Sequence, residues 1–291
     1  MPAKTVVLGA GGMLGHKMFQ VLQGAFPATI GIMRGPQAAD WQTGELMTGL
    51  DAADFAELAR VLQKIRPDYI VNCVGIIKQR PEAKDPIAAI SINALLPHRL
   101  AELAAGWGGR LIHFSTDCVF SGARGGYDEH DPCDALDFYG RTKFLGEVDM
   151  GNALILRTSI IGRELKGRRS LLEWFLAQRG GSVPGFRRVI WSGITTNHAA
   201  RLVAEIICKH PGLSGLYHVA SQPLSKLELL FLLRKAYALA IEIVPDDAES
   251  SDRSMSGEKL RRAIGYRAPS WPELICELAS DPTPYESWLP Q

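Results

Sequence analysis

The first 160 residues alternate short apolar runs with helical patterns. Runs rich in β-branched residues predict buried strands at residues 5–8, 29–32, 69–72, 111–114 and 154–156. Between them, apolar positions three and four residues apart predict a helix over 54–65 that begins after a capping Asp54. A second helix is predicted over 87–105, with a kink or break at Pro97. Apolar strands that alternate with helices indicate an α/β fold, a doubly wound parallel sheet of Rossmann type.

The pattern changes after residue 162. A polar, basic connection over 163–170 precedes a series of short helices and single strands, which we place at 170–178, 197–209, 216–219, 225–239 and 271–279. We therefore expect a Rossmann domain over 1–162 and a smaller α+β lobe over 163–291. Parts of 195–220 are expected to return to the large sheet.

Composition and charge exclude several classes of protein. The chain has 291 residues, with 32 Lys and Arg against 31 Asp and Glu, and this balance argues against a dedicated nucleic-acid binder. It has no uncharged apolar run of about 18 residues, so no membrane span is predicted. Five cysteines without a CxxC pair argue against a disulfide framework and a zinc site, and they fit a cytoplasmic location. We expect no metal.

A glycine-rich turn follows the first predicted strand. Gly9, Gly12 and Gly15 lie between that strand and a helical stretch over 16–22. Glycine permits a tight exit from the strand, a close approach of a diphosphate to the backbone, and a helix packed close to the sheet. The helix N-terminus would then stabilise the diphosphate of a dinucleotide. The alternative is a glycine-rich turn that binds no ligand.

The end of the second predicted strand bears on which dinucleotide binds. A carboxylate there would favour NAD, but the strand ends at Met33-Arg34-Gly35. Arg34 could instead pair with a 2′-phosphate, helped by His16 or Lys17. The sequence thus favours NADP(H), with NAD(H) as the alternative. Arg34 as a solvated surface residue is the other interpretation.

Candidate acid–base chemistry lies on a predicted helix over 139–147. Tyr139 and Lys143 are four residues apart and share a helix face. An ammonium about 5 Å from the phenol favours the phenolate by roughly 3 kcal/mol at an effective dielectric near 20, or about two pKa units. Ser115 and Thr116 end a strand where ligands of parallel sheets bind, and either hydroxyl could contact a substrate carbonyl. The alternatives are an exposed helical pair and a hydroxyl that caps its own backbone.

These motifs resemble the extended short-chain dehydrogenase/reductase superfamily, and within it the dTDP-4-dehydrorhamnose reductases. The segments that carry the resemblance are Gly9-Ala-Gly-Gly-Met-Leu-Gly15, Val71-Asn-Cys-Val-Gly75, Ser115-Thr-Asp-Cys-Val-Phe-Ser-Gly122, Tyr139-Gly-Arg-Thr-Lys-Phe-Leu-Gly-Glu147 and Leu156-Arg-Thr-Ser159. Three segments near the expected sugar pocket, at 72–79, Cys118 and 192–195, differ from the usual family pattern. The resemblance therefore implies the reaction class more firmly than the sugar.

The resemblance implies a role for each site residue. The catalytic residues would be Thr116, Tyr139 and Lys143, with Tyr139 protonating the C4 oxygen of a nucleotide-linked 4-keto-6-deoxyhexose. The residues implied to bind the cofactor are Gly9, Gly12, Met13, Leu14, Gly15, Arg34, Asp51, Cys73, Val74, Gly75, Asn93, Ser115, Tyr139, Lys143 and Thr158. Those expected to contact substrate are Lys78, Val119, Phe120, Trp191 and Thr195.

We thus expect an NADPH-dependent oxidoreductase that acts on a nucleotide sugar. The alternatives are a nucleotide-sugar epimerase or dehydratase with tightly bound NAD, and a non-catalytic regulatory subunit of the same fold. We expect no nucleic-acid or membrane partner. A homodimer is the alternative to a monomer.

Overall fold

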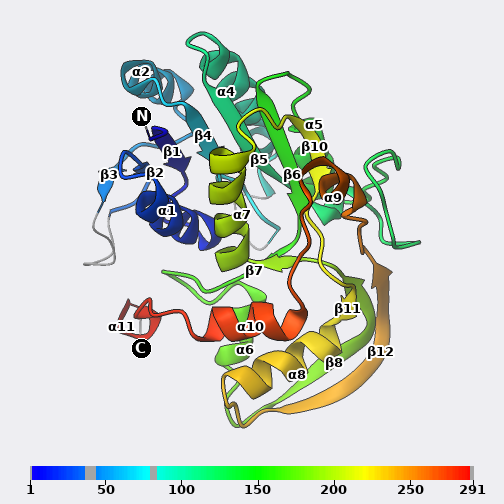
Figure 1. Cartoon of the computed structure of the whole chain (residues 1–291). Coiled ribbons are helices and arrows are strands. Elements are labelled where there is room, and N and C mark those ends of the chain that lie inside the picture. Colours follow the sequence, from blue (N-terminus) through cyan, green and yellow to red (C-terminus); the bar gives the residue numbers. More distant parts are fainter. Residues whose placement is uncertain (1, 37–43, 79–83, 289–291) are drawn as a thin grey trace.

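A seven-stranded, wholly parallel sheet forms the centre of the molecule. The computed structural model describes residues 2–36, 44–78 and 84–288, without the side chains of residues 287 and 288. The strand order is β10-β6-β5-β4-β1-β2-β3. The strands are β1 (Thr5–Leu8), β2 (Ile30–Met33), β3 (Glu45–Thr48), β4 (Tyr69–Asn72), β5 (Arg110–Thr116), β6 (Ala153–Thr158) and β10 (Gly215–His218). The predicted Rossmann-type sheet is confirmed (Figure 1).

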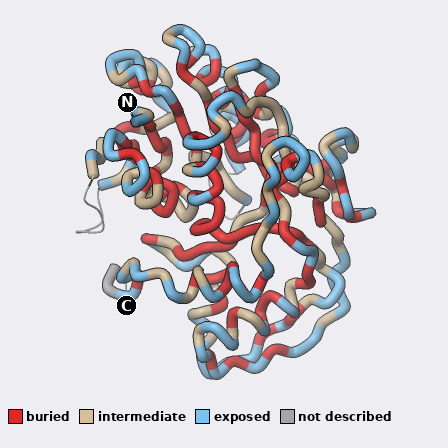
Figure 2. The backbone as a smooth tube through the Cα atoms, viewed as in Figure 1, coloured by how far each residue is buried: buried red, intermediate tan, exposed pale blue. Residues whose placement is uncertain are grey.

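Helices cover both faces of this sheet (Figures 1 and 2). On one face, α1 (Met13–Ala25) and α7 (Thr196–Lys209) pack side by side and share one apolar core with the sheet. On the other face, α2 (Phe55–Ile65) and α4 (Leu96–Ala105) share a second core. Asp54 caps α2, accepting a hydrogen bond from the backbone N–H of Glu57, as predicted. Among the described residues, we find no helix with the length and apolarity that a membrane crossing requires.

The helix predicted over 87–105 is interrupted. It consists of α3 (Pro86–Ala89), the π-helix η2 (Ile90–Leu95) and α4. Pro97 lies at the start of α4, which continues from η2 without leaving helical backbone angles, since Leu96 N–H bonds Ser91 O. The interruption therefore lies next to Pro97, as predicted, while its form, a wide π-turn, was not predicted. The helix expected over 139–147 is α5 (Phe138–Leu145), which Asp137 caps.

The second lobe contains strands that the sequence pattern did not reveal. Its sheet has the order β11-β8-β12 and packs against α6, α8 and α10 around a third core. The elements are β8 (Ser182–Trp191), β11 (Leu224–Ser225), β12 (Glu242–Asp252), α6 (Leu171–Leu176), α8 (Lys226–Ala236) and α10 (Trp271–Ala279). Much of β8 and β12 is exposed, so neither strand carries a continuous apolar run. The same holds for β3, an edge strand of the large sheet.

Several segments of the second half pack on the Rossmann sheet. β10 pairs with β6, and α9 (Glu258–Ile264) places Leu260 in the core beneath α7. The short strands β7 (Ile160–Ile161) and β9 (Ile194–Thr195) pair with each other. The 3₁₀ turn η3 (Asp117–Val119) follows β5 directly. The domain boundary at residue 162 stays a prediction.

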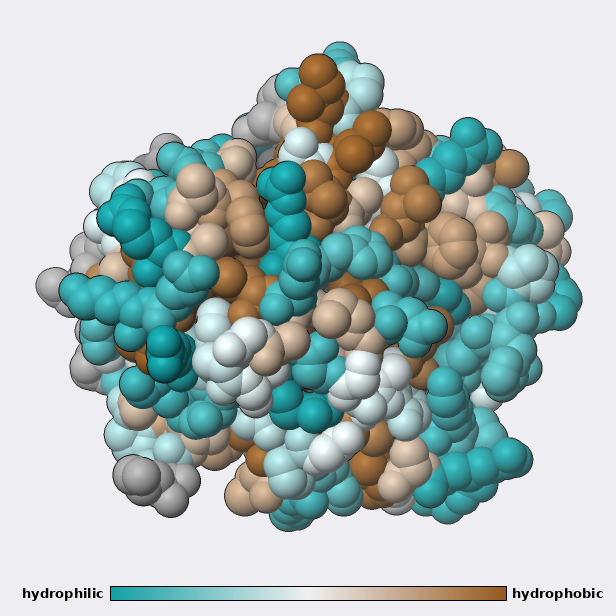
Figure 3. Space-filling view, turned by 90° about the horizontal axis from the view of Figure 1, so that it is seen from above, coloured by the Kyte–Doolittle hydropathy of each residue, from teal (hydrophilic) through white to brown (hydrophobic). Residues whose placement is uncertain are grey.

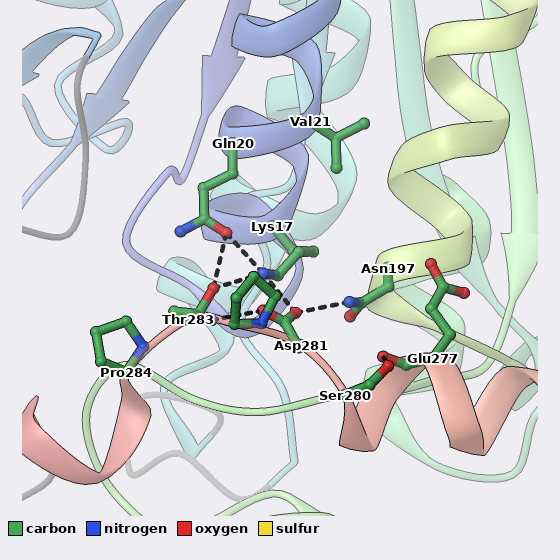
Figure 4. A pocket seen from close by; sticks show the side chains of 10 residues that line it. Lys17, Gln20, Val21, Asn197, Glu277, Ser280, Asp281, Thr283 and Pro284 are labelled. Carbon is green, nitrogen blue, oxygen red and sulfur yellow. Dashed lines mark hydrogen bonds and ion pairs between the residues drawn. The ribbon is translucent and has the colours of Figure 1, made fainter.

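The C-terminal segment ties α10 back to α1. It leads through residues 280–284 to α11 (Tyr285–Trp288), and beside it lies a cavity of about 610 Å³ (Figure 4). Lys17 Nζ lies 2.6 Å from Asp281 Oδ2, and both side chains are almost fully buried. Asn197 of α7 also donates to Asp281, at 2.6 Å. One buried carboxylate therefore joins α1, α7 and the C-terminal segment.

Replacing Lys17 by Met would leave the Asp281 carboxylate buried without its cation. Breaking a buried ion pair from one side costs about 3–5 kcal/mol. We expect Lys17→Met to lose that much unfolding free energy in urea titrations. The double variant Lys17→Met/Asp281→Asn should recover most of it, since an amide oxygen still accepts from Asn197. A single variant as stable as the parent would contradict this account.

Candidate active site

The glycine turn between β1 and α1 leaves no room for side chains. Gly9 has φ +80°, and a Cβ at Gly15 would lie 2.0 Å from the carbonyl oxygen of Gly9. Gly12 is the N-cap of α1, and no described side chain caps this helix or adds an acid to its first turn. The first backbone N–H groups of the helix, from Met13 and Leu14 onward, are therefore available to an anion. The turn fits the diphosphate of a dinucleotide.

The loop after β4 packs against this turn. A Cβ on Gly9 would lie 3.1 Å from Val74 and 3.2 Å from the backbone of Cys73. Asn93, on η2, accepts from the backbone N–H of Ile76 and donates to its carbonyl oxygen, both at 2.9 Å. The structure thus brings the predicted loop at 73–75 together with Gly9, and it makes Asn93 the residue that holds the loop.

Arg34 and Asp51 meet at the far edge of the sheet. Arg34 follows β2 and Asp51 follows β3, and Arg34 Nη1 lies 3.6 Å from Asp51 Oδ2 with both side chains well exposed. Sequence analysis found no acid at the end of β2, but the unpredicted strand β3 leads the chain back to the same edge. An arginine and an acid therefore lie where the adenosine ribose of a dinucleotide would bind.

The prediction that His16 or Lys17 helps Arg34 to bind a 2′-phosphate is wrong. His16 is fully buried, where it bonds Gly12 O at 2.9 Å and the Tyr285 hydroxyl at 2.8 Å. Burial lowers the pKa of His16 to about 4, so the ring carries no charge at neutral pH. Lys17 is committed to Asp281. Both side chains hold the C-terminal segment, and neither faces the edge where Arg34 lies.

Thr116 and Tyr139 form the centre of the predicted catalytic group. Thr116 ends β5, and Tyr139 lies in the first turn of α5. Burial raises the pKa of Tyr139, and a hydrogen bond with Thr116 offsets part of that rise. Thr116 Oγ1 also accepts from the backbone N–H of Cys118 at 3.1 Å. The alternative interpretation, a hydroxyl that caps its own backbone, therefore applies to Thr116 as well. A phenol with a raised pKa starts protonated, as a proton donor must.

Lys143 does not lower the pKa of Tyr139 in this structure, contrary to our estimate. Its Nζ donates to Phe114 O at 2.6 Å and lies 3.2 Å from His113 Nε2. Helical spacing put the two residues on one face, but the lysine chain bends inward onto β5. Burial lowers the pKa of Lys143 to about 8. Desolvation therefore decides both pKa values, and our estimate neglected it.

The family model for the RmlD substrate binding domain matches residues 3–281. The chain belongs to this family. The predicted resemblance is thereby confirmed over nearly the whole length.

Relatives and solved structures agree with that assignment. A probable low-salt glycan biosynthesis reductase of Haloferax volcanii is 27% identical over 227 residues, 74% of each protein. A dTDP-4-dehydrorhamnose reductase of Burkholderia thailandensis is 30% identical over 189 residues, 59% of this chain and 62% of the relative. The structure of dTDP-4-dehydrorhamnose reductase from Bacillus anthracis in complex with NADP is 22% identical, with a TM-score of 0.78 over 96% of this chain and 99% of that one. The similarity to this solved structure, at 22% identity, shows the fold alone.

Ser115, predicted on the cofactor side, is engaged elsewhere in this member of the RmlD family. Its hydroxyl donates to Glu147 at 2.6 Å, and Glu147 also accepts two hydrogen bonds of 2.6 Å from Arg157. Of the two candidate hydroxyls, Thr116 is therefore the one beside Tyr139. Thr158 lies opposite Thr116 in the register of β6 with β5.

The predicted substrate residues divide into two groups. Lys78 Nζ lies 5.7 Å from the centre of the Tyr139 ring and pairs with Asp137 at 2.6 Å, so the structure places it at the site. Val119, Phe120 and Thr195 have no exposed surface, and their prediction as substrate contacts is wrong. The first two pack in a small core that includes Tyr127, and Thr195 caps α7.

One lysine near the site, Lys226, was missed, and it contacts a predicted substrate residue. Trp191, a predicted substrate residue, is nearly buried, and its Nε1 has no partner among the described residues. Lys226 begins α8 with its Nζ 4.0 Å from the centre of the Trp191 ring, and it acts electrostatically on Asp117 and Cys118. His113, buried in β5, contacts Lys143. Nothing in the local sequence distinguishes Lys226, because its neighbours come from distant segments.

No metal cluster stands out in the described part of the chain. Within residues 2–36, 44–78 and 84–288, no three His, Cys, Asp or Glu side chains gather as metal ligands would. All five cysteines are free thiols.

The glycine turn can be tested with two substitutions in the same helix. Gly15→Ala places a methyl group against Gly9 O, so the first turn of α1 must move away from β1. We expect NADPH affinity, measured by fluorescence titration, to fall at least tenfold, or about 1.4 kcal/mol. Gly24→Ala is the matched control, because its Cβ meets nothing within 4 Å. Unchanged NADPH binding by folded Gly15→Ala would exclude the turn as the diphosphate site.

Proposed function

We propose that this protein is an NADPH-dependent reductase of the 4-keto group of a nucleotide-linked deoxyhexose. The observation that carries the proposal is the phenol of Tyr139, beside Thr116 at the carboxyl end of β5, the same sheet edge as the glycine turn. The family and the reductases among its relatives support the same class of reaction.

The residues have distinct tasks in such a reduction. A bound reduced nicotinamide supplies the hydride that forms the new C–H bond. Tyr139 gives its phenolic proton to the carbonyl oxygen, which becomes the hydroxyl, and then regains a proton from solvent. Thr116 donates a hydrogen bond to the same oxygen and stabilises the charge that develops on it.

Two lysines offer positive charge to the substrate. Lys78 lies over Tyr139, and Lys226 lies over Trp191, within electrostatic reach of Asp117. A nucleotide sugar carries hydroxyl and phosphate oxygens that such groups bind. We propose that Lys78 contacts the sugar and that Trp191 shapes the opposite wall. Thr158 and the loop at 73–75 would border the nicotinamide.

One observation favours the alternative with NAD. Asp51 lies beside Arg34, and a carboxylate at this edge suits the free ribose hydroxyls of NAD. An epimerase or dehydratase that keeps NAD bound would use such an acid. Arg34 favours a 2′-phosphate and hence the reductase, and the two side chains can be tested separately.

The expected homodimer has support on one surface. Large apolar side chains are exposed on α3, η2 and α5, among them Ile87 at 77% and Leu145 at 60%. Seen from above, most of the molecule is hydrophilic, with hydrophobic side chains gathered toward one margin (Figure 3). Exposed apolar groups of this size mark association surfaces. The homodimer and the cytoplasmic location stay predictions.

The decisive substitution for the reaction is Tyr139→Phe. We expect NADPH oxidation with a panel of 4-keto-6-deoxy sugar nucleotides to fall by about 10²–10⁴, the typical contribution of a general acid. NADPH binding should persist, which separates lost chemistry from lost folding. Tyr237→Phe, whose hydroxyl bonds Leu278 O in the second lobe, is the control. If Tyr139→Phe turns over like the parent, Tyr139 is not the proton donor. A parent protein inactive on the whole panel would favour the regulatory subunit.

Cofactor choice is tested at the Arg34–Asp51 pair. A charge-assisted hydrogen bond to a phosphate contributes about 1.5–3 kcal/mol. We therefore expect Arg34→Ala to raise the KM for NADPH roughly ten- to hundredfold and leave that for NADH nearly unchanged. Asp51→Asn should lower the KM for NADPH by removing the competing carboxylate. A preference for NADH that survives Arg34→Ala would refute the assignment.

A further inference from the structure

His16 lies in the first turn of α1 and holds the peptide unit at which that helix begins. Its Nδ1 lies 2.9 Å from Gly12 O, and its backbone N–H donates to the same oxygen at 3.0 Å. The Gly12 carbonyl therefore accepts two hydrogen bonds from one residue. Gly12 has no side chain to restrict rotation about its own backbone, so these two contacts set the direction of its carbonyl.

The direction of the Gly12 carbonyl also sets the direction of the Met13 N–H. Both groups belong to one trans peptide unit, in which they point opposite ways. Hydrogen bonds that the carbonyl accepts polarise the unit as well, and they make its N–H a stronger donor. Met13 N–H is the first donor of α1, where a helix has no partner of its own for it, and it lies in the turn that fits a diphosphate.

Tyr285 of the C-terminal segment fixes the state of the His16 ring. A carbonyl oxygen only accepts, so Nδ1 of the ring carries a proton. Burial lowers the pKa of His16 to about 4, so the ring is neutral at pH 7 and has no second proton. Lys17 and Arg163 also disfavour a charged ring, and Asp281, which acts in the opposite direction, is paired with Lys17. Nε2 must therefore accept from the Tyr285 hydroxyl, 2.8 Å away.

The neighbours of Tyr285 hold its phenol in place as the donor. The Arg163 guanidinium lies 4.7 Å from the centre of the ring, and Lys17 Nζ lies 5.6 Å from it. Arg163 in turn pairs with Glu173 of α6 at 2.6 Å, and both side chains are almost without solvent. The Thr283 side chain hydrogen-bonds the same phenol, but burial dominates and raises the pKa of Tyr285, so the phenol keeps its proton.

We propose that His16 and Tyr285 are positioning residues for the cofactor, through which the docked C-terminal segment orients the Met13 N–H toward the diphosphate. This segment lies directly against α1 (Figure 4). Because such coupling is reciprocal, a bound dinucleotide strengthens the docking of residues 280–286, and their docking strengthens dinucleotide binding. The inference rests on the cofactor part of the proposed function and not on the sugar substrate.

The first test uses the parent protein. In two-bond ¹H–¹⁵N spectra of histidine-labelled protein, His16→Asn identifies the His16 signals among those of seven histidines. We expect a neutral ring protonated at Nδ1 between about pH 6 and 8. Adding NADPH should shift the ¹⁵Nδ1 signal, and adenosine 2′-monophosphate, which lacks the diphosphate, should leave it in place. A proton on Nε2, or equal shifts with both ligands, would overturn the proposal.

Tyr285→Phe removes the donor to His16 and keeps the aromatic ring. We expect the Kd for NADPH to rise about three- to tenfold, with that for adenosine 2′-monophosphate nearly unchanged. Tyr266→Phe is the matched control, because its hydroxyl lies 2.9 Å from His198 Nε2, a tyrosine–histidine contact outside α1 and the C-terminal segment. An unchanged Kd for NADPH in folded Tyr285→Phe, or an equal rise in Tyr266→Phe, would refute the coupling.

Two substitutions of His16 separate positioning from packing. An asparagine amide nitrogen takes the place of Nδ1 and can donate to Gly12 O, whereas a glutamine amide extends to the place of Nε2 and leaves that oxygen with one donor. Both variants lose the imidazole and therefore unfolding free energy. We expect His16→Gln to weaken NADPH binding at least about threefold more than His16→Asn does. Equal NADPH affinities in the two would show a purely structural role. If either variant does not fold, the shift of the parent's ¹⁵Nδ1 signal decides.

Hydrogen exchange measures the reciprocal effect. The Tyr285 amide donates to Thr283 O at 2.8 Å, within the C-terminal segment. We expect saturating NADPH to slow its exchange in the parent and not in His16→Gln. The same rate with and without NADPH in the parent would overturn the coupling. Inactivity of the parent on every sugar nucleotide would refute the proposed reduction instead, and it would leave these binding results as they are.

Discussion

Burial of polar side chains at the carboxyl edge of the parallel sheet governs this site. Asn72, His113, Ser115 and Thr116 all lie there almost without solvent. Each must find a partner inside the protein, because an unsatisfied buried group costs about 1–3 kcal/mol. Ser115 finds Glu147, and Asn72 finds His113. Thr116 donates to Asp117 Oδ1 at 3.2 Å and accepts from the backbone N–H of Cys118, and it lies beside Tyr139. The internal pairing thus leaves Thr116, rather than Ser115, next to the phenol.

The parts of the fold and site that could be predicted from the sequence are those that depend on local pattern. The β1–glycine turn–α1 unit is local, since the clash at Gly15 is with Gly9, six residues away. β3, β8 and β12 were missed because exposed strands lack the continuous apolar runs that mark a buried strand. His16 was misjudged for another reason: its partner, Tyr285, is 269 residues away in sequence. No local pattern carries such a contact.

The acid–base pair shows where sequence reasoning about charge fails. Helical spacing correctly placed Tyr139 and Lys143 on α5, but a Coulomb estimate treats both as fixed charges in a uniform medium. The structure buries Lys143 and half-buries Tyr139, and desolvation favours the neutral form of each: it raises the pKa of the phenol and lowers that of the ammonium. The sign of the predicted shift at Tyr139 was therefore wrong.

The protonated form of Tyr139 suits the direction of the proposed reaction. A dehydrogenase that removes a proton from an alcohol needs a phenolate at the start, which a nearby ammonium would stabilise. A reductase needs the phenol, and desolvation favours that form of Tyr139. Lys78 is partly exposed beside Tyr139, where its charge can meet the oxygens of a sugar nucleotide. Lys143 instead contacts Phe114 O and His113 inside the sheet. The site therefore divides these two lysines by depth: Lys78 suits substrate binding, and Lys143 lies against the strand that carries Thr116.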